Sequence, residues 1–380
     1  MSERSIYKLT KFFMTAIGLW GKFETKQAQK WYRIYGFSTK TIYILYNLSM
    51  VVKVTQVALD HSESQNVFGL VSLAALITLV NIKIVVFSFN NVSGLFQHVI
   101  DEEGNILLSA SSDSDIKRSY LDHCKFYRAT SRFQVFTTVV SVYFYIIFNV
   151  HKLVSHKLAP GENFMYELWL PFDINENGPV MIVCKLCLSQ MGVLFNSCSQ
   201  VMLQSLMVFV TSQLAILQIR ARTMFDRRTG VEALIEKHQF LIGFVSKINE
   251  AIKYVILLEY ILNSVNIATA LLQILMSHSL IEITFSLVYL LLLLSQVMIF
   301  GWTASRISTQ SFNVSNAVYS SNWTEQSESV KRTLLIVMMR AQKPLTLDIG
   351  PFIPMNNEAC LTTLKGAYSY AGVMRHGYLQ

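Results

Sequence analysis

The sequence contains few charged residues and few prolines for its length. Only 15% of the 380 residues are charged and only six are proline, whereas 52% are hydrophobic. Soluble domains carry about 25% charged residues, so a water-soluble core could not hide this much apolar surface. The mean hydropathy of +0.39 and the long apolar stretches indicate an all-α, polytopic membrane protein.

Motifs of the common catalytic and metal sites are also missing. The sequence contains no His-Glu-x-x-His, no Gly-x-Ser-x-Gly and no phosphate-binding glycine loop. Cys184 and Cys187 form a Cys-x-x-Cys, but a zinc site needs a second pair of ligands. We therefore expect no enzyme, no metal site and no cofactor. The absence of internal repeats argues against a transporter with two related halves and favours a single domain over residues 1–380.

Seven stretches are long and apolar enough to be considered as spans, since a membrane-crossing helix needs about 20 such residues. They lie near residues 39–60, 66–89, 133–151, 179–215, 254–277, 281–303 and 357–377. The fourth is too long for a hydrocarbon core of about 30 Å, so we expect its inner end to project into the cytoplasm. The seventh is the least apolar.

The basic residues predict the orientation of these spans. The sequence contains 32 Lys and Arg residues. Of these, 25 lie in residues 1–40, 90–132, 216–253 and 304–356, and only three lie in the segments that alternate with them between the spans and at the C-terminus. Because cytoplasmic loops are rich in Lys and Arg, the N-terminus is predicted to be cytoplasmic and the C-terminus extracellular. This topology explains the net charge of +8 without a nucleic-acid partner, and it is opposite to that of G-protein-coupled receptors.

Several short motifs carry a family resemblance, most of them after the sixth span. They are Trp323, Arg340-Ala341-Gln342-Lys343-Pro344, Gly350-Pro351-Phe352-Ile353-Pro354, Tyr368-Ser369-Tyr370 and, earlier, Trp169-Leu170-Pro171-Phe172-Asp173. With these motifs the chain resembles the insect odorant receptor family, and its length is similar to that of the ligand-specific, tuning subunits.

The resemblance implies a subunit of a ligand-gated, non-selective cation channel in the plasma membrane of olfactory sensory neuron dendrites. Such subunits assemble as heterotetramers with a common co-receptor, bind a small volatile organic ligand and conduct cations. The alternatives are a gustatory-receptor-like channel subunit, whose usual C-terminal sequence is absent here, and a metabotropic chemoreceptor.

The last span carries a stripe of small and polar residues at helical spacing. Spacings of four and three residues place Thr362, Gly366, Ser369, Val373 and His376 on one face. Such a face can line a wet pore that closes by dewetting at an apolar ring, here at Val373, and the resemblance implies the same position for the gate. The alternative is a face for close helix packing.

The resemblance implies that two basic segments, 216–253 and 304–356, form a cytoplasmic anchor at the subunit interface. Within the second, residues 328–343 should form a helix that Pro344 ends. The alternative is an amphipathic helix on the inner leaflet.

An odorant pocket needs aromatic walls and few polar groups. Following the resemblance, we expect it in the outer half of the helix bundle. The candidates are Val71, Ala75, Val142, Tyr143, Ile146, Gly192, Phe195, Phe285 and Tyr289, although ordinary core packing explains any one of them equally well. Glu259 is an acid inside the fifth span. It is either a functional group, or it lies near the inner boundary and pairs with a basic loop residue or snorkels to the surface.

Overall fold

The computed structural model describes residues 6–20, 25–59, 67–90, 92–109, 114–154, 164–171, 178–225, 230–277 and 279–378. These residues are almost entirely helical, as predicted. The helices are α1 (Tyr7–Ala16), α2 (Lys26–Leu59), α3 (Val67–Phe89), α4 (Val92–Ser109), α5 (Ser114–Val154), α6 (Pro179–Arg222), α7 (Val231–Met276), α8 (Leu280–Tyr319), the 3₁₀ turn η1 (Trp323–Glu325), α9 (Glu328–Ala341) and α10 (Asn357–Tyr378).

Six of the described helices are long and apolar enough to cross a membrane, namely α2, α3, α5, α6, α7 and α8. Helices suit this environment because lipid offers no hydrogen-bond partners for exposed backbone groups. The seventh candidate, α10, has 22 residues and so a length of about 33 Å, sufficient for one crossing, but it is not among these six. Its crossing remains a prediction.

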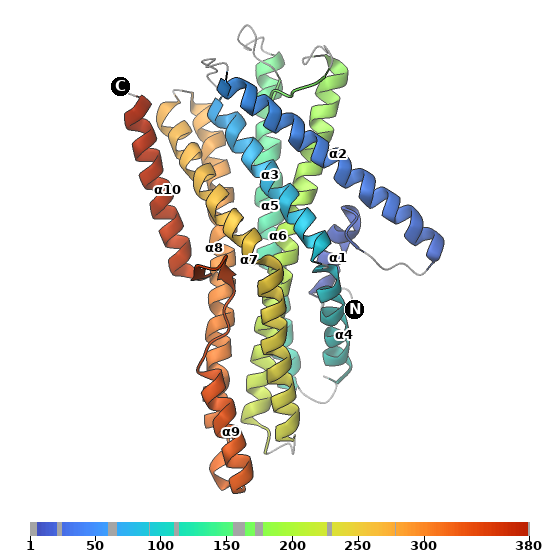
Figure 1. The fold of residues 1–380 in the computed structure, drawn as a ribbon, viewed down its shortest axis with the longest axis vertical. Helices are drawn as coiled ribbons and strands as arrows, with labels where there is room; N and C mark the ends of the chain where they lie inside the picture. The colour runs from blue at the N-terminus through green and yellow to red at the C-terminus, as the bar shows by residue number, and fades with distance from the viewer. Residues whose placement is uncertain are drawn as a thin grey trace.

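The helices form an upper bundle and a narrower lower stalk (Figure 1). Helices α5, α6, α7 and α8 run through both parts, because each begins or ends well beyond its predicted span. Pro179 occupies the first turn of α6, where its missing N–H costs nothing. Helix α6 is the most buried of the six, and it packs chiefly against α5 and α8.

The stalk contains the two predicted anchor segments. The first half of α7 and the end of α8 extend downwards, and α9 packs mainly on α8 and also on α7 (Figure 1). Leu334, Val337, Met338 and Ala341 form the buried face of α9. The predicted helix over 328–343 is observed as α9, which ends two residues earlier, at Ala341, and is packed in the stalk with part of its surface exposed.

A short hairpin connects the stalk to α10. Strands β1 (Asp348–Ile349) and β2 (Ile353–Pro354) pair antiparallel, with Asp348 opposite Pro354. The turn begins at Gly350, whose φ of +60° is strained for other residues. A Cβ here would also lie 2.8 Å from Leu257 Cδ2, so glycine allows the turn to pack directly on α7.

Candidate functional site

An aromatic cluster joins α2 and α6 in the upper bundle. The rings of Tyr43 and Phe195 are stacked with their centroids 4.6 Å apart, and Tyr46 lies 5.8 Å from both Tyr43 and Tyr166. Gly192, one turn before Phe195, faces the same tyrosine, since a Cβ there would lie 3.5 Å from Tyr43 Oη. This arrangement forms an apolar wall with phenolic hydroxyls, which suits a small organic ligand.

A second aromatic cluster joins α5, α8 and α3. Phe285 and Tyr289 stack at 6.3 Å, and Tyr145 lies 5.3 Å from Phe285. The Tyr289 hydroxyl is 3.5 Å from Ser72 Oγ, which in turn donates a hydrogen bond to Asn266 Oδ1 at 2.9 Å. The second cluster therefore combines stacked rings with a short chain of polar groups.

Below these clusters lies an ion pair that is almost completely buried. Lys83 Nζ of α3 is 2.8 Å from Glu259 Oε1 of α7, and the two side chains are 0% and 2% exposed. Glu259 Oε2 has no hydrogen-bond partner in the described part of the chain. The two charges attract each other strongly at this separation, because the surrounding interior has a low dielectric constant.

Glutamine side chains extend this ion pair into a buried polar network. Gln200 Nε2 of α6 donates to Glu259 Oε1 at 3.1 Å and to Gln296 Oε1 of α8 at 3.3 Å. One turn later, Gln204 Nε2 donates to Thr303 Oγ1 at 3.1 Å. Buried polar groups are costly unless they are paired, so this network fixes the relative positions of α3, α6, α7 and α8.

The predicted stripe of α10 faces away from its own subunit. Ala359, Cys360, Ala367 and Ala371 form the buried face against α7 and α8. On the opposite side Thr362 and Ser369 are exposed, Gly366 is half-buried and Val373 is 70% exposed. The side chain of His376 lies outside the described residues. This outward face of α10 is therefore available to water or to a neighbouring subunit.

The family is identified by comparison with known proteins. A family profile described as "7tm Odorant receptor" matches residues 67–368. The chain belongs to the odorant receptor family. It is accordingly a multi-pass membrane protein of a family of receptors rather than enzymes, which confirms the expectations of a polytopic membrane protein and of no enzyme.

Named relatives match this odorant receptor over parts of its length. Odorant receptor 10 of Aedes albopictus is 31% identical over 147 residues, covering 38% of this chain and 39% of that protein. Odorant receptor Or2 of Anopheles gambiae is 26% identical over 38% of each chain. The chain thus matches less than half the length of these two relatives. Odorant receptor 33b of Drosophila melanogaster is 22% identical over 66% of this chain and 69% of its own.

Solved structures match almost the whole receptor. The olfactory receptor OR5 from Machilis hrabei has a TM-score of 0.79 at 15% identity, covering 97% of this chain and 96% of that one. The same receptor in complex with eugenol also gives 0.79, at 16% identity. These likenesses establish a shared fold.

The structure brings four of the nine predicted pocket residues into the two aromatic clusters and places the other five outside them. Gly192 and Phe195 lie in the first cluster, and Phe285 and Tyr289 in the second. Tyr143 is 48% exposed and its hydroxyl reaches Gln190 Oε1 at 3.4 Å, so it lies at the periphery of the subunit. The remaining four are half-buried: Val71, Ala75, Val142 and Ile146.

Two cavities are found elsewhere in the described structure. One, of about 130 Å³, lies between α1, α2, α3 and α6, and the other, of about 330 Å³, lies between α8 and α10. Neither is lined by any of the nine predicted residues. The role of the two aromatic clusters in ligand binding therefore stays a prediction.

The expectation that Glu259 pairs with a loop residue is wrong, because its partner Lys83 is buried inside the adjacent span. Tyr43, the centre of the first cluster, was missed as well. Its signal in the sequence is weak, since Tyr43 is one of several aromatic residues in the same span and nothing local shows that it faces α6.

The hairpin and the first turn of α10 are clamped onto the receptor core. Asn249 Nδ2 donates to Asp348 Oδ2 and Asn249 Oδ1 accepts from the Asp348 backbone, both at 2.8 Å. Cys360 Sγ lies 3.2 Å from Tyr260 Oη of α7 and donates to the Val297 carbonyl of α8 at 3.3 Å. The lower end of α10 is therefore fixed to both neighbouring helices.

Proposed function

We propose that this receptor is the odorant-binding subunit of a heteromeric, ligand-gated, non-selective cation channel. It would work in the plasma membrane of olfactory sensory neuron dendrites, with its N-terminus in the cytoplasm and its C-terminus outside. Its partners are co-receptor subunits in a heterotetramer, and its ligand is a small volatile organic molecule. The basic-residue distribution supports the orientation.

The observation that carries the proposal is the exposed stripe of α10. Thr362 and Ser369 point away from the subunit that bears them. Each hydroxyl donates to the carbonyl one turn earlier, but its oxygen can still accept a hydrogen bond, which lipid tails cannot supply. A shared aqueous conduit between subunits would hydrate them, and Val373 would supply the apolar ring that closes it. Close packing of α10 on a neighbouring helix is the competing explanation, and the gate test below separates the two.

Ligand recognition is assigned to the two aromatic clusters. The first offers stacked rings at Tyr43 and Phe195, and the second offers Phe285 and Tyr289 with the Ser72 hydroxyl as a polar contact. A receptor of the same fold has been solved with eugenol, which supports a small organic ligand here. The stalk helices would form the cytoplasmic anchor between subunits.

Co-expression with the co-receptor tests the channel directly. We expect odorant-evoked cation current without added nucleotide, recorded under voltage clamp over a panel of volatile esters, alcohols, terpenes and aromatics. A ligand-dependent second messenger without current would instead identify a metabotropic receptor.

The gate assignment is tested in the same recordings. Val373→Ser should raise resting current or change ion selectivity while surface expression stays normal, because a polar ring no longer dewets. Leu361→Ser is the matched control, since Leu361 is also an exposed apolar residue of α10 (51%) but lies at the cavity beside α8. Identical conductance in the wild type and in Val373→Ser would refute the gate.

A further inference from the structure

The first half of α2 forms a basic arm, defined here as residues 26–40, that leaves the helix bundle (Figure 1). Only Gly36 is buried within it. The sequence contains no Asp or Glu between residues 25 and 59, so nothing on this helix neutralises the basic residues. Lys26, Lys30 and Arg33 are exposed and have no ion-pair partner among the described residues.

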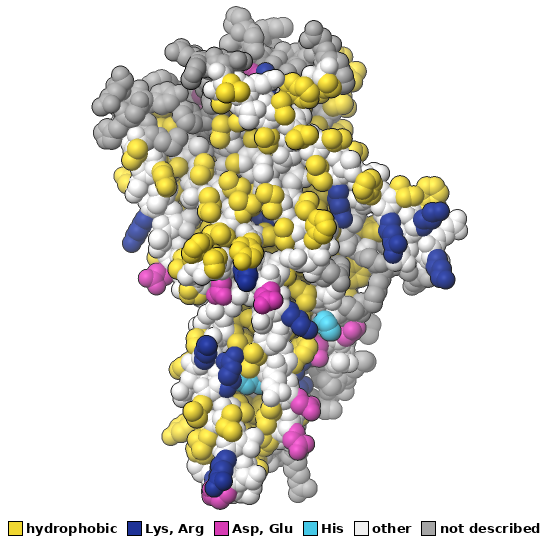
Figure 2. Space-filling view, in the orientation of Figure 1, with side chains coloured by type: hydrophobic (Ala, Val, Ile, Leu, Met, Phe, Trp, Pro, Cys, Tyr) yellow, Lys and Arg dark blue, Asp and Glu magenta, His cyan; other side chains and the backbone are white. Residues whose placement is uncertain are grey.

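Exposed aromatic and aliphatic side chains alternate with these cations. Trp31 is 66% exposed and Phe37 is 73% exposed, while Ile34 is 49% exposed. Figure 2 shows the basic side chains of the arm near the height at which the hydrophobic surface of the bundle gives way to charged surface. Aromatic rings and Lys or Arg at this level are characteristic of the interface between lipid and water.

The arm is held in place by contacts with α1. The Tyr32 hydroxyl lies 3.1 Å from the Met14 carbonyl and 3.0 Å from the Thr15 carbonyl. Gly18, at φ +77°, touches Gly36 so closely that a Cβ on Gly18 would lie 2.3 Å from the Gly36 Cα. The arm therefore has a fixed direction, and its cations are presented in a fixed arrangement.

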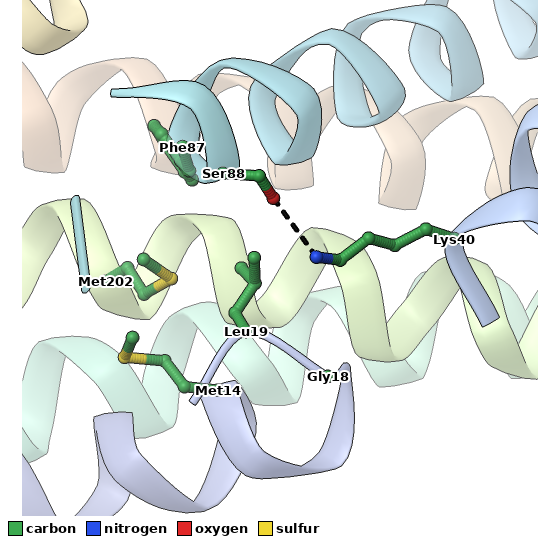
Figure 3. Close-up of a pocket in the computed structure, with 7 residues that line it drawn as sticks. All are labelled: Met14, Gly18, Leu19, Lys40, Phe87, Ser88 and Met202. Carbon is green, nitrogen blue, oxygen red and sulfur yellow. Dashed lines mark hydrogen bonds between the residues drawn. The ribbon is translucent and has the colours of Figure 1, made fainter. Parts of the chain in front are cut away.

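A cavity of about 130 Å³ opens at the root of the arm (Figure 3). Lys40 Nζ lies 3.1 Å from Ser88 Oγ, and no acidic side chain lines the cavity. The other walls include Met14, Phe87 and Met202. The volume is below the roughly 300–1,000 Å³ of small-molecule pockets, so the cavity suits a single small anionic group.

We propose that the basic arm lies on an anionic membrane surface and that the cavity at its root takes the phosphate of one anionic phospholipid through Lys40 and Ser88. Basic clusters next to a membrane span attract anionic lipids. The cavity has room for the phosphate alone, so the acyl chains would lie outside it against the exposed apolar residues of the arm, such as Phe37. The proposed orientation assigns this lipid to the cytoplasmic leaflet, whereas the site itself does not depend on the channel function.

Lipid retention by the purified full-length receptor tests the site. The receptor is reconstituted in equimolar phosphatidylserine and phosphatidylcholine, washed with detergent, and its retained lipids are measured by mass spectrometry. Wild type should retain phosphatidylserine preferentially. Lys40→Gln should lower the preference about five-fold, and removing the charges of Lys26, Lys30 and Arg33 together should lower it about 100-fold.

Matched variants separate the site from general electrostatics. Lys40→Arg should keep the preference, and Lys331→Gln, which removes a cation from the surface of α9, should leave it unchanged. Inorganic phosphate in excess should not displace the lipid. Displacement by inorganic phosphate at the same concentration as the lipid would refute the lipid assignment. Equal retention of both lipids by wild type, or equal losses in Lys40→Gln and Lys331→Gln, would overturn the proposal.

Discussion

The buried ion pair predicts a distinctive pattern of stability among its variants. Glu259→Gln keeps the size of the side chain and an oxygen that can accept from Gln200, but it leaves the Lys83 ammonium buried without a counter-charge. Breaking a buried pair from one side costs about 3–5 kcal/mol. Lys83→Met should cost a similar amount, because the Glu259 carboxylate then remains alone.

Removing both charges should reverse most of this loss. A buried pair replaced by uncharged side chains of similar volume is often neutral or stabilising, so Lys83→Met combined with Glu259→Gln should approach wild-type stability. The stabilities of the wild type and the three variants can be ranked by their apparent melting temperatures in detergent, followed by tryptophan fluorescence. The double variant should melt above either single variant and close to wild type.

The control breaks a different ion pair with the same substitution. Lys53 lies 3.0 Å from Glu167, but the two side chains are 26% and 30% exposed. Because water screens such a pair, Lys53→Met should cost less than about 1 kcal/mol. A melting temperature of Glu259→Gln equal to that of the wild type would contradict this explanation, and so would a double variant less stable than both single variants.

Three further changes have defined outcomes. Gly18→Ala forces a Cβ onto Gly36 at a positive φ, so it should cost at least about 1–2 kcal/mol and lower surface expression in a flow-cytometry assay. Gly301→Ala places a Cβ 2.1 Å from Cys360 Sγ; it should cost about 1–3 kcal/mol and lower the melting temperature, and adding Cys360→Ala should recover part of that loss. Burial lowers the pKa of His238 below its ordinary 6.5, so the folded state resists protonation and stability should fall as pH drops below 6.5, a loss that His238→Leu should reduce in melting curves.

Gly243→Ala provides the control for both glycine variants. Gly243 lies inside α7, and a Cβ there would meet nothing within 4 Å. It should be neutral or stabilise the receptor by about 0.5–1 kcal/mol. Equal losses for Gly243→Ala and Gly18→Ala would contradict the packing explanation.

Helix positions could be predicted from the sequence because lipid imposes a minimum apolar length on each span. The predicted span 66–89 and the observed α3, Val67–Phe89, agree closely. The inner ends were harder to predict: α7 begins at Val231, well before the predicted 254, because helices that leave the membrane as a packed stalk no longer need to be apolar on every side.

Pairings between distant helices could not be predicted. Lys83 and Glu259 are opposite charges in separate spans, which is a recognisable signal, but no local pattern states that α3 and α7 bring them together. The Tyr43–Phe195 stack depends likewise on how α2 crosses α6. Such contacts follow from tertiary packing. The sequence alone can only show that residues spaced three or four apart share one face of a helix, as in the stripe of α10.

The clamp at the lower end of α10 restricts how this helix can move. Sliding along its own axis would break the Asn249–Asp348 contacts and the Cys360 contacts together. Tilting about the clamp leaves them in place and produces its largest displacement at the far end. In such a lever, Val373 travels farther than Thr362, because it lies 11 residues and about 16 Å farther along the axis.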